Sequence, residues 1–446
     1  MAFSPIELVV PPYFPYDTPA LGASQLKANL SKAGYRANVH YFNVQVARLL
    51  GRSLYDLFCF TGDHHGRSPL LGDYLFSMAT FEKTREAVEA YYEELIAPTR
   101  SAQLLTRLFP RLSPADLLSK LSETLSELTS NLLAAILSAR PEIVGVSSSF
   151  QTNGAAIYIV KRVKALSPDT VTIMGGANCL GEMGEELLTR IPELDFVANG
   201  EADQTFVEFV RAVHERRTPR IHGINGRGTR VGGSSSAAAR TPEPGTVLTT
   251  EEFRALPAPD FDEYFEVCRQ LGLEQPKTVL YQAARGCWWG QKHPCTFCAV
   301  NLQGMAFRSK PPRQALDETR ALLKRYRSNR LFLVDSILNI GYFGTFFTWL
   351  AEDPLAEFHF ESTVNLTKEQ VHILRRAGAR NVNPGIESLS DNTLKLLRKP
   401  NSALHNLRAL KWFSDVGTAV YWSILCGAPG ETDASVRTKR RSSSRL

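Results

Sequence analysis

Three cysteines within a stretch of twelve residues carry the clearest chemical signal in the sequence. The segment RGCWWGQKHPCTFCAVN places Cys287, Cys295 and Cys298 with seven and then two residues between them. A 4Fe-4S cluster takes four ligands, so three thiolates leave one iron open to a small molecule. Structural zinc needs a fourth Cys or His, and the near candidate is His293, inside the same loop beside Pro294. The ligand count favours an iron–sulfur cluster, with zinc as the alternative.

The other cysteines and the chain's hydropathy indicate the cellular compartment of the protein. Of seven cysteines, an odd number, four are scattered: Cys59, Cys179, Cys268 and Cys426. A disulfide framework is therefore not expected, and a metal site in a reducing compartment fits better. No stretch approaches the roughly 20 uninterrupted apolar residues of a membrane span. The start, MAFSPIELVV, also lacks the basic flank and long apolar run of a secretion signal. We expect a cytoplasmic protein with no membrane partner.

The positive charge is concentrated at one end of the chain. Five basic residues fall within the last ten, RTKRRSSSRL, and the formal net charge is +6, so the body is close to neutral. A nucleic-acid-binding face needs a basic stripe on a folded element, so no nucleic-acid partner is expected. Residues 433–446 lack apolar periodicity and are interpreted as a basic, disordered tail, with a nucleic-acid-binding tail as the alternative.

Residues 1–212 have the pattern of an α/β domain. Each predicted strand is followed by a helical pattern or by Gly, Ser, Asn or Pro, which favours a doubly wound parallel sheet with ligands at the carboxyl ends of its strands. Leucines at helical spacing predict a helical insertion at about 47–137, in which His64-His65 is interpreted as ordinary surface. The predicted strands are 6–10, 37–42, 142–147, 171–174 and 196–197, and the helices are 21–34 and 155–166.

A second alternation follows a linker assigned to residues 213–270. Five strand–helix units in 271–432 predict an open or partial (β/α) barrel, whose working face is the carboxyl end of the strands. The cysteine segment follows the first of these strands, where a catalytic loop is expected. The predicted strands are 278–283, 331–334, 358–363, 381–386 and 419–425, and the helices are 314–326, 342–350, 368–377 and two within 390–414.

The segment from Arg285 to Lys310 resembles the cluster loop of radical S-adenosylmethionine (SAM) enzymes. Its long first spacing is similar to that of the branch that matures ribosomally made peptides (RiPPs), the radical C-methyltransferases. The resemblance implies a 4Fe-4S cluster on the three cysteines and SAM at the open iron. It also assigns cofactor contacts behind the cysteines, in chain order, to Phe297 near the adenine, Asp335, Glu387, Ser388, Gly427 and Glu431.

The amino-terminal sheet resembles the cobalamin-binding, Rossmann-like domain that precedes the barrel in this branch. The chain has no Asp-x-His-x-x-Gly sequence to supply a histidine ligand to cobalt. The alternative is that these strand ends are those of any doubly wound domain. If cobalamin binds, contacts are expected from Ser147 to Phe150, Gly175 to Asn178 and Gly200-Glu201, including Ser148 and Gly176, with 11–21 closing one edge.

The resemblance implies a cobalamin-dependent methylation of a carbon atom in a precursor peptide. The partners would be that peptide and a one-electron donor such as flavodoxin or ferredoxin. Two alternatives remain open: a radical SAM enzyme of another type, such as an epimerase or a thioether-forming enzyme, and an inactive binding protein or zinc-stabilised scaffold. The resemblance extends to about Thr432, beyond which the expected further strand and helices are missing. A truncated barrel is therefore expected, which puts catalytic competence in question.

Overall fold

The computed structural model describes residues 5–59, 70–227, 245–273, 278–298 and 305–432. The chain forms two compact units. The amino-terminal unit comprises Met1–Thr246 and Pro259–Pro276, and the carboxyl-terminal unit comprises Val247–Ala258 and Lys277–Leu446. The chain therefore passes from one unit to the other three times.

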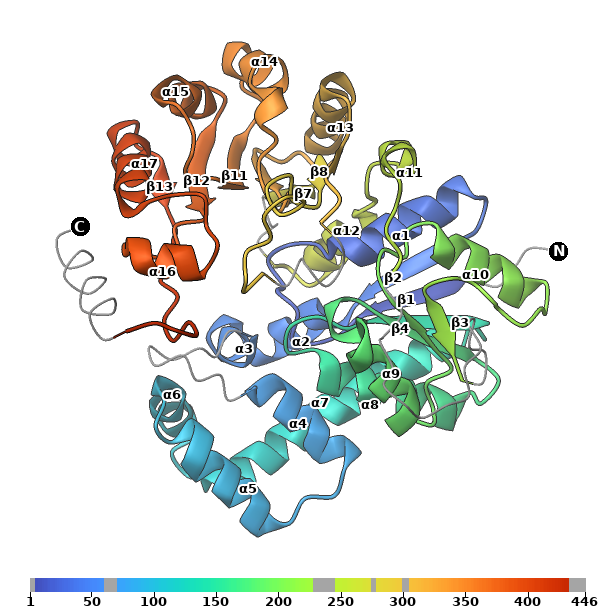
Figure 1. Ribbon diagram of the computed structural model, residues 1–446. Helices are drawn as coiled ribbons and strands as arrows, with labels where there is room; N and C mark the ends of the chain where they lie inside the picture. The colour runs from blue at the N-terminus through green and yellow to red at the C-terminus, as the bar shows by residue number, and fades with distance from the viewer. Residues whose placement is uncertain (1–4, 60–69, 228–244, 274–277, 299–304, 433–446) are drawn as a thin grey trace. The chain divides into compact units, whose positions relative to one another are not determined.

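A mostly parallel sheet is the frame of the amino-terminal unit (Figure 1). Its strand order is β2-β1-β3-β4-β5-β6, and all neighbours are parallel except β5 and β6. Because β1 lies between β2 and β3, the order of the strands reverses there, and open α/β sheets bind ligands at such a switch point. The strands are β1 (Ile6–Val10), β2 (Ala37–Tyr41), β3 (Ile143–Ser147), β4 (Val171–Gly175), β5 (Phe196–Ala198) and β6 (Ile224–Gly226).

Helices pack against this sheet and bury its apolar side chains. Val9, Val146 and Met174 lie in one buried cluster with Ile159 of α8 and Leu187 of α9. The strand β1 is buried along its whole length, as a central parallel strand should be. The helices are α1 (Leu21–Lys32), α8 (Asn153–Leu166), α9 (Glu182–Arg190), α10 (Thr205–His214) and α12 (Asp262–Gln270).

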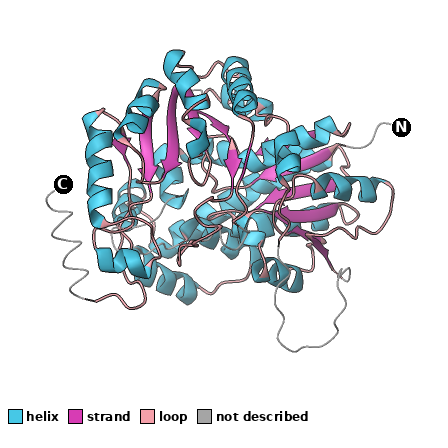
Figure 2. Cartoon of the chain, turned by 45° about the horizontal axis from the view of Figure 1, so that its top comes forward, coloured by secondary structure: helices cyan, strands magenta, loops and turns pink. Residues whose placement is uncertain are grey.

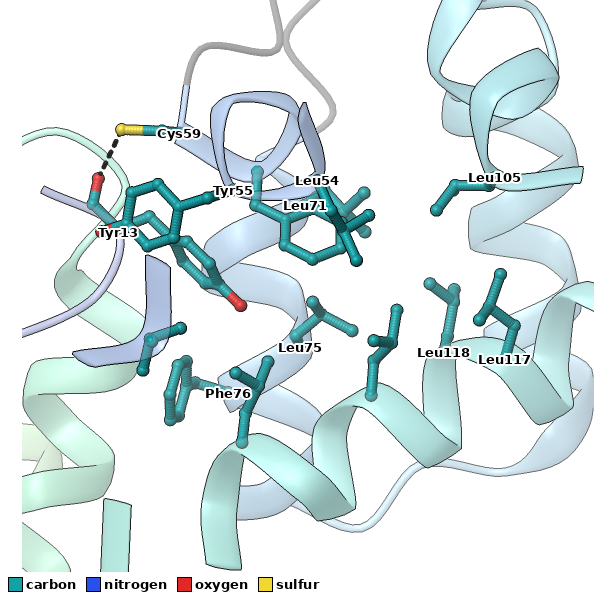
Figure 3. Close-up of a cluster of buried hydrophobic side chains, with 14 of the residues drawn as sticks. Tyr13, Leu54, Tyr55, Cys59, Leu71, Leu75, Phe76, Leu105, Leu117 and Leu118 are labelled. Carbon is teal, nitrogen blue, oxygen red and sulfur yellow. Dashed lines mark hydrogen bonds between the residues drawn. The ribbon is translucent and has the colours of Figure 1, made fainter. Parts of the chain in front are cut away.

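The leucine-rich segment between β2 and β3 forms a helical insertion with a core of its own (Figure 3). Leu117 and Leu118 of α7 face Leu75 of α4 and Leu105 of α6 in this core. The Ser113 side chain accepts a hydrogen bond from the Asp116 N–H, with Pro114 in the first turn of α7. The helices are α2 (Phe42–Leu50), α3 (Arg52–Cys59), α4 (Leu71–Thr80), α5 (Arg85–Tyr91), a π-helical turn (Tyr92–Ile96), α6 (Arg100–Leu108) and α7 (Pro114–Leu137).

The carboxyl-terminal unit alternates strands and helices around a five-stranded parallel sheet (Figure 2). The order is β13-β12-β11-β10-β7, which is the chain order reversed and is that of an open barrel. The strands are β7 (Thr278–Tyr281), β10 (Arg330–Leu333), β11 (Glu357–Ser362), β12 (Ala379–Pro384) and β13 (Ala419–Val420). The helices are α13 (Pro312–Arg325), α14 (Phe346–Glu352), α15 (Lys368–Arg376), α16 (Asp391–Leu396) and α17 (Ala403–Asp415).

Two predicted features differ from the structure. The interval assigned to a linker, 213–270, contains β6, α11 (Thr250–Ala255) and α12. The segments on both sides of its glycine- and serine-rich part have capping or apolar residues that form regular elements. Thr249 and Glu252 form a capping box on α11, and α12 buries Tyr264, Phe265 and Cys268. The strand predicted at 419–425 ends at Val420, and beyond it Ile424 forms an isolated bridge with Glu387.

Several predictions concern residues outside the described part, namely His64-His65 and the tail 433–446. Within the described residues, no helix combines the length and the apolar character that a membrane crossing requires.

Candidate cofactor site

The cysteine loop leaves the carboxyl end of β7 and is fixed at both ends. Two short strands, β8 (Ala284–Arg285) and β9 (Arg308–Ser309), pair in antiparallel fashion across its base. The Lys310 N–H donates to the Ala283 carbonyl, and the Cys287 N–H donates to the Met305 carbonyl. The cysteines are therefore held on a loop whose entry and exit lie side by side.

The three cysteines are half-buried thiols that influence one another. No cysteine of the chain is in a disulfide. Burial raises the pKa of Cys295; the nearby Lys399 ammonium opposes this change, and the Cys298 and Cys287 thiols add to it. Cys287 and Cys298 therefore lie near enough to Cys295 to act on its charge.

Two glycines allow the loop to bend around Cys287. Gly286 has a left-handed φ of 82°, and a Cβ there would collide with the Ala306 carbonyl. A Cβ on Gly290 would lie 2.7 Å from the sulfur of Met305. The Gly290 N–H donates to the Cys287 sulfur over 3.3 Å, which fixes this side chain against the turn.

The donor set fits an iron–sulfur cluster. By number and chemical type, three thiols on one loop suit three irons of a 4Fe-4S cluster and leave the fourth iron without a protein ligand. His293, the proposed zinc ligand, is exposed, and its ring lies 5.0 Å from that of Trp289. Among the residues described, which omit 299–304, no three His, Cys or acidic side chains are arranged around a single metal ion.

The paired tryptophans behave differently from each other. The Trp288 indole N–H donates to the Leu338 carbonyl over 3.2 Å, so this ring anchors the loop to the segment after β10. The Trp289 indole nitrogen is buried and has no hydrogen-bond acceptor among the described residues. An unpaired buried donor is costly, so a bound group with acceptor atoms would stabilise this part of the loop.

Asp335 supports the backbone at the start of the cysteine loop. It follows β10, is only 6% exposed, and accepts the N–H groups of Ala283 and Ala284 at 2.8 and 2.9 Å on one carboxylate oxygen. Burial raises its pKa to about 7, against the lowering effects of these two hydrogen bonds and of Lys310. The resemblance implies a cofactor contact for Asp335, and in the structure one of its carboxylate oxygens is hydrogen-bonded to the loop's own backbone.

Glu387 lies in a charged cluster beside Cys295. It follows β12 with a left-handed φ of 57°, and its carboxylate is 3.5 Å from the Lys399 ammonium. Both side chains are more than four-fifths buried. Burial, followed by repulsion from Glu387, raises the pKa of Glu361 on β11. The cluster thus brings opposite charges to the carboxyl ends of β11 and β12.

Sequence reasoning missed Lys399. It lies twelve positions after Glu387, in the Lys-Pro pair that follows α16, and no motif spacing marks it. Its nitrogen would lie 2.7 Å from a Cβ on Gly385, so Gly385 leaves room for it. Only the folded chain brings this cation close to both Glu387 and Cys295.

The other predicted residues of this unit divide into exposed and internally bonded ones. Phe297 is 43% exposed. Ser388 is fully buried, and its hydroxyl accepts from the Ser390 N–H. The Glu431 carboxylate accepts from the Thr393 hydroxyl and from the Gly427 N–H, each at 2.8 Å. Ser388 and Glu431 therefore stabilise turns at the ends of the strands.

In the amino-terminal unit, the loops after β3 and β4 are joined by hydrogen bonds. The Ser148 N–H donates to the Gly175 carbonyl over 2.7 Å, and the Asn178 N–H donates to the Ser148 carbonyl over 3.1 Å. Gly176 has a φ of 117°, and a Cβ there would collide with the Ser148 carbonyl. Ser147 donates to the Val9 carbonyl over 3.4 Å, connecting the end of β3 to β1 at the switch point.

Gly200 and Glu201 are placed against another part of the same unit. Gly200 has a φ of 101°, and its Cα hydrogens face the backbone of Gly245 and Thr246. The Glu201 N–H donates to the Thr246 carbonyl over 2.8 Å. The backbone at Gly200 and Glu201 is thus in contact with the segment that carries Gly245 and Thr246.

Comparison with known protein families assigns the carboxyl-terminal unit. Residues 281–440 match the model of the Radical SAM superfamily. The match includes all three cysteines, Asp335, Glu387 and Lys399. This part of the chain is therefore similar to radical SAM domains.

Two curated relatives are similar in sequence to about two thirds of the chain. An anaerobic magnesium-protoporphyrin IX monomethyl ester cyclase of Rubrivivax gelatinosus is 23% identical over 313 residues, which is 67% of this chain and 53% of the relative. An uncharacterized methyltransferase of Pyrococcus horikoshii is 24% identical over 310 residues, 66% of this chain and 62% of the relative. The chain thus spans little more than half the length of these relatives.

Solved structures of cobalamin-dependent radical SAM enzymes have the same fold. OxsB with bound aqua-cobalamin aligns with a TM-score of 0.63 at 15% identity, covering 98% of this chain and 51% of OxsB. TsrM of Kitasatospora setae, a radical SAM methyltransferase with cobalamin and a [4Fe-4S] cluster bound, aligns with a TM-score of 0.63 at 14% identity, covering 99% and 70%. The similarity includes both units, because nearly the whole chain is covered.

Proposed function

We propose that the chain is a cobalamin-dependent radical SAM methyltransferase that modifies a carbon atom of a ribosomally made peptide. The observation that carries the proposal is the set of three half-buried thiols, none in a disulfide, on one loop within the residues that match the Radical SAM superfamily. The choice of a peptide as substrate depends on the resemblance of the cysteine spacing to the peptide-maturation branch. Electrons would come from a small donor such as flavodoxin or ferredoxin.

The carboxyl-terminal unit has residues suited to the cluster and to the amino-acid part of SAM. When bound, a 4Fe-4S cluster with one open iron supplies the electron that cleaves SAM to a 5′-deoxyadenosyl radical. The three cysteines would hold the cluster, and Asp335 keeps the start of their loop in place. Glu387 and Lys399 offer a negative and a positive charge beside Cys295, which matches the ammonium and carboxylate of an amino acid.

The amino-terminal unit has a surface suited to cobalamin, which supplies the methyl group when bound. The loops after β1, β3 and β4 lie at the switch point and next to it, where a doubly wound sheet binds its ligand. Gly175 and Gly176 keep the end of β4 free of side chains. None of the loop residues 11–20, 148–152 and 176–181 is a histidine, so these loops offer no imidazole to cobalt.

The first experiment is anaerobic reconstitution of the full chain with iron, sulfide and hydroxocobalamin. We expect iron–sulfur absorption, bound cobalt and formation of 5′-deoxyadenosine from SAM. Cys295→Ala should abolish the iron–sulfur absorption and the 5′-deoxyadenosine, because a cluster needs its third thiolate. Cys426→Ala, which removes an exposed thiol of the same unit, should retain both.

Metal content separates the proposal from its rivals. An intact cluster without cobalt would leave a radical SAM enzyme of another reaction type. One zinc per chain without iron would indicate a zinc-stabilised scaffold. Retention of cluster and 5′-deoxyadenosine formation in Cys295→Ala would contradict the cluster assignment itself.

A further inference from the structure

An exposed aromatic ring lies at the switch point of the amino-terminal sheet. Phe150 follows β3 and is 67% exposed, the largest exposed fraction of any phenylalanine in the described part of the chain. Its backbone is left-handed, with a φ of 54°. That conformation costs an L-residue other than Gly, Asn or Asp roughly 1 kcal/mol or more, and a bulky side chain adopts it rarely. An apolar ring is thus kept in solvent by an unfavourable backbone.

The conformation of Phe150 is imposed by the neighbouring loop. The Asn178 side-chain amide donates to the Phe150 carbonyl and to the Ser148 hydroxyl, each at 3.1 Å. The Ser149 N–H donates to the Thr152 hydroxyl over 2.8 Å, which closes the turn around Phe150. Gly176 lets the β4 loop approach the Ser148 carbonyl. These contacts fix the main chain on both sides of the ring.

The helical insertion fixes the other end of the same loop. Asp73 of α4 accepts the Gly154 N–H over 2.7 Å in the first turn of α8. A carboxylate is stabilised at the amino end of a helix, where N–H groups lack partners. The loop from Ser147 to Gly154 is therefore held by β4 on one side and by α4 on the other.

A second aromatic ring accompanies Phe150. Phe14 belongs to the loop after β1, and its ring lies 6.1 Å from that of Phe150 at an interplanar angle of 57°. The two rings come from the ends of β1 and β3, the strands between which the sheet order reverses. They form an apolar surface at the place where this type of sheet binds its ligand.

We propose that Phe150, supported by Phe14, is the apolar contact for the flat ring of cobalamin. Backbone strain that is held at a ligand-binding edge is typical of a preorganised contact. This inference rests on the proposed function and adds to it the residue that determines affinity for the ring. The side chain presents carbon and hydrogen only, so it recognises the face of the ring and not the metal.

The test is a titration with hydroxocobalamin, followed by absorbance, of three proteins: the unchanged full chain, Phe150→Ala and Phe81→Ala. Phe150→Ala should raise the dissociation constant for cobalamin about tenfold to a hundredfold. The upper limit follows because burial of a Phe side chain contributes roughly a hundredfold to affinity at most. Phe81→Ala is the matched control, because Phe81 is 47% exposed in the same unit with an extended backbone. It should bind cobalamin as the unchanged chain does.

Thermal unfolding of the unloaded chain provides the second measurement. Phe150→Asn places a residue that accepts the left-handed conformation, so the melting temperature should stay the same or rise by a few degrees. A fall of more than about 4 °C would show that the ring stabilises the free chain, which overturns the inference.

The binding results distinguish the inference from the proposed function. If Phe150→Ala weakens binding by less than about threefold while the unchanged chain binds cobalamin, the inference fails and the proposed function stands. If the unchanged chain binds no cobalamin, both fail.

Discussion

The cysteine loop after β7 and the aromatic loop after β3 both follow the end of a parallel strand, but they hold their functional residues differently. The cysteine loop is defined by its side chains, three thiols at a fixed spacing. The aromatic loop is defined by its backbone: a left-handed Phe150, a glycine at φ 117° and a network of hydrogen bonds from Asn178. A side-chain site is visible in a sequence, whereas a backbone site becomes visible only in the fold.

The largest effect predicted beyond the cysteines concerns Lys399, the residue of the cysteine site that spacing did not reveal. Lys399→Gln removes the cation beside Glu387 and Cys295 but keeps a polar side chain of similar length. Loss of a charge-assisted contact should raise the KM for SAM about tenfold to a hundredfold. Iron content measures the cluster separately, and it should stay unchanged.

Lys411→Gln is the matched control, because Lys411 pairs with Asp415 on the exposed side of α17. Its KM for SAM should equal that of the unchanged chain. An equal KM in Lys399→Gln would remove Lys399 from the site and leave the cysteine loop as a site defined by spacing alone.

The next prediction tests the backbone-defined loop. In Gly176→Ala a Cβ would collide with the Ser148 carbonyl, at a φ that an alanine rarely adopts. The free energy of unfolding should fall by about 2 kcal/mol, and cobalamin binding should weaken as well. Urea denaturation and the cobalamin titration measure the two effects.

Gly22→Ala provides the comparison for Gly176→Ala. Gly22 lies in α1, and a Cβ there meets no atom within 4 Å. The substitution should stabilise the chain by about 0.5–1 kcal/mol. A stable Gly176→Ala variant with unchanged cobalamin affinity would show that the β4 loop does not constrain the site.

The last prediction concerns the pH dependence of stability and distinguishes the carboxylates that support the two loops. Burial raises the pKa of Asp335 to about 7 and that of Asp73 to about 6. Both pKa values lie above that of an aspartate in the unfolded chain. At any pH between the unfolded and the folded pKa, the folded chain therefore binds more protons than the unfolded chain. Stability is therefore fully present below about pH 4 and falls as the pH rises through about 6 for Asp73 and about 7 for Asp335.

Substitution by Asn removes the proton but keeps an oxygen that accepts the backbone N–H groups. Between about pH 4 and 7 the free energy of unfolding should fall by roughly 1–3 kcal/mol less in Asp335→Asn than in the unchanged chain. In Asp73→Asn the difference should be smaller and should end near about pH 6. Urea denaturation at a series of pH values measures both. Unchanged slopes in the two variants would mean that neither carboxyl group is protonated in the folded chain.

Much of the architecture could be predicted from local sequence. The run IELVV predicts a strand at 6–10, and β1 has these bounds, because a short run with four apolar residues that ends at Pro11-Pro12 fits a buried parallel strand. Helix α15 begins after Thr367 with a capping box, close to the predicted 368–377. The predicted linker is wrong at α11 and α12, which lie within it. The Gly- and Ser-rich composition of the interval indicates a linker, whereas the helix-capping residues inside it indicate helices.

By itself, the sequence determined the chemistry of one site. Three thiols at a fixed spacing have few chemical roles, and all three lie within a single loop. It also determined the alternation of strands and helices, which depends on local periodicity. Only the tertiary structure placed Lys399 against Glu387, turned Asp335 toward the backbone of Ala283 and Ala284, and covered Gly200 with Thr246. These contacts join residues far apart in the chain, and burial decides their charges and partners.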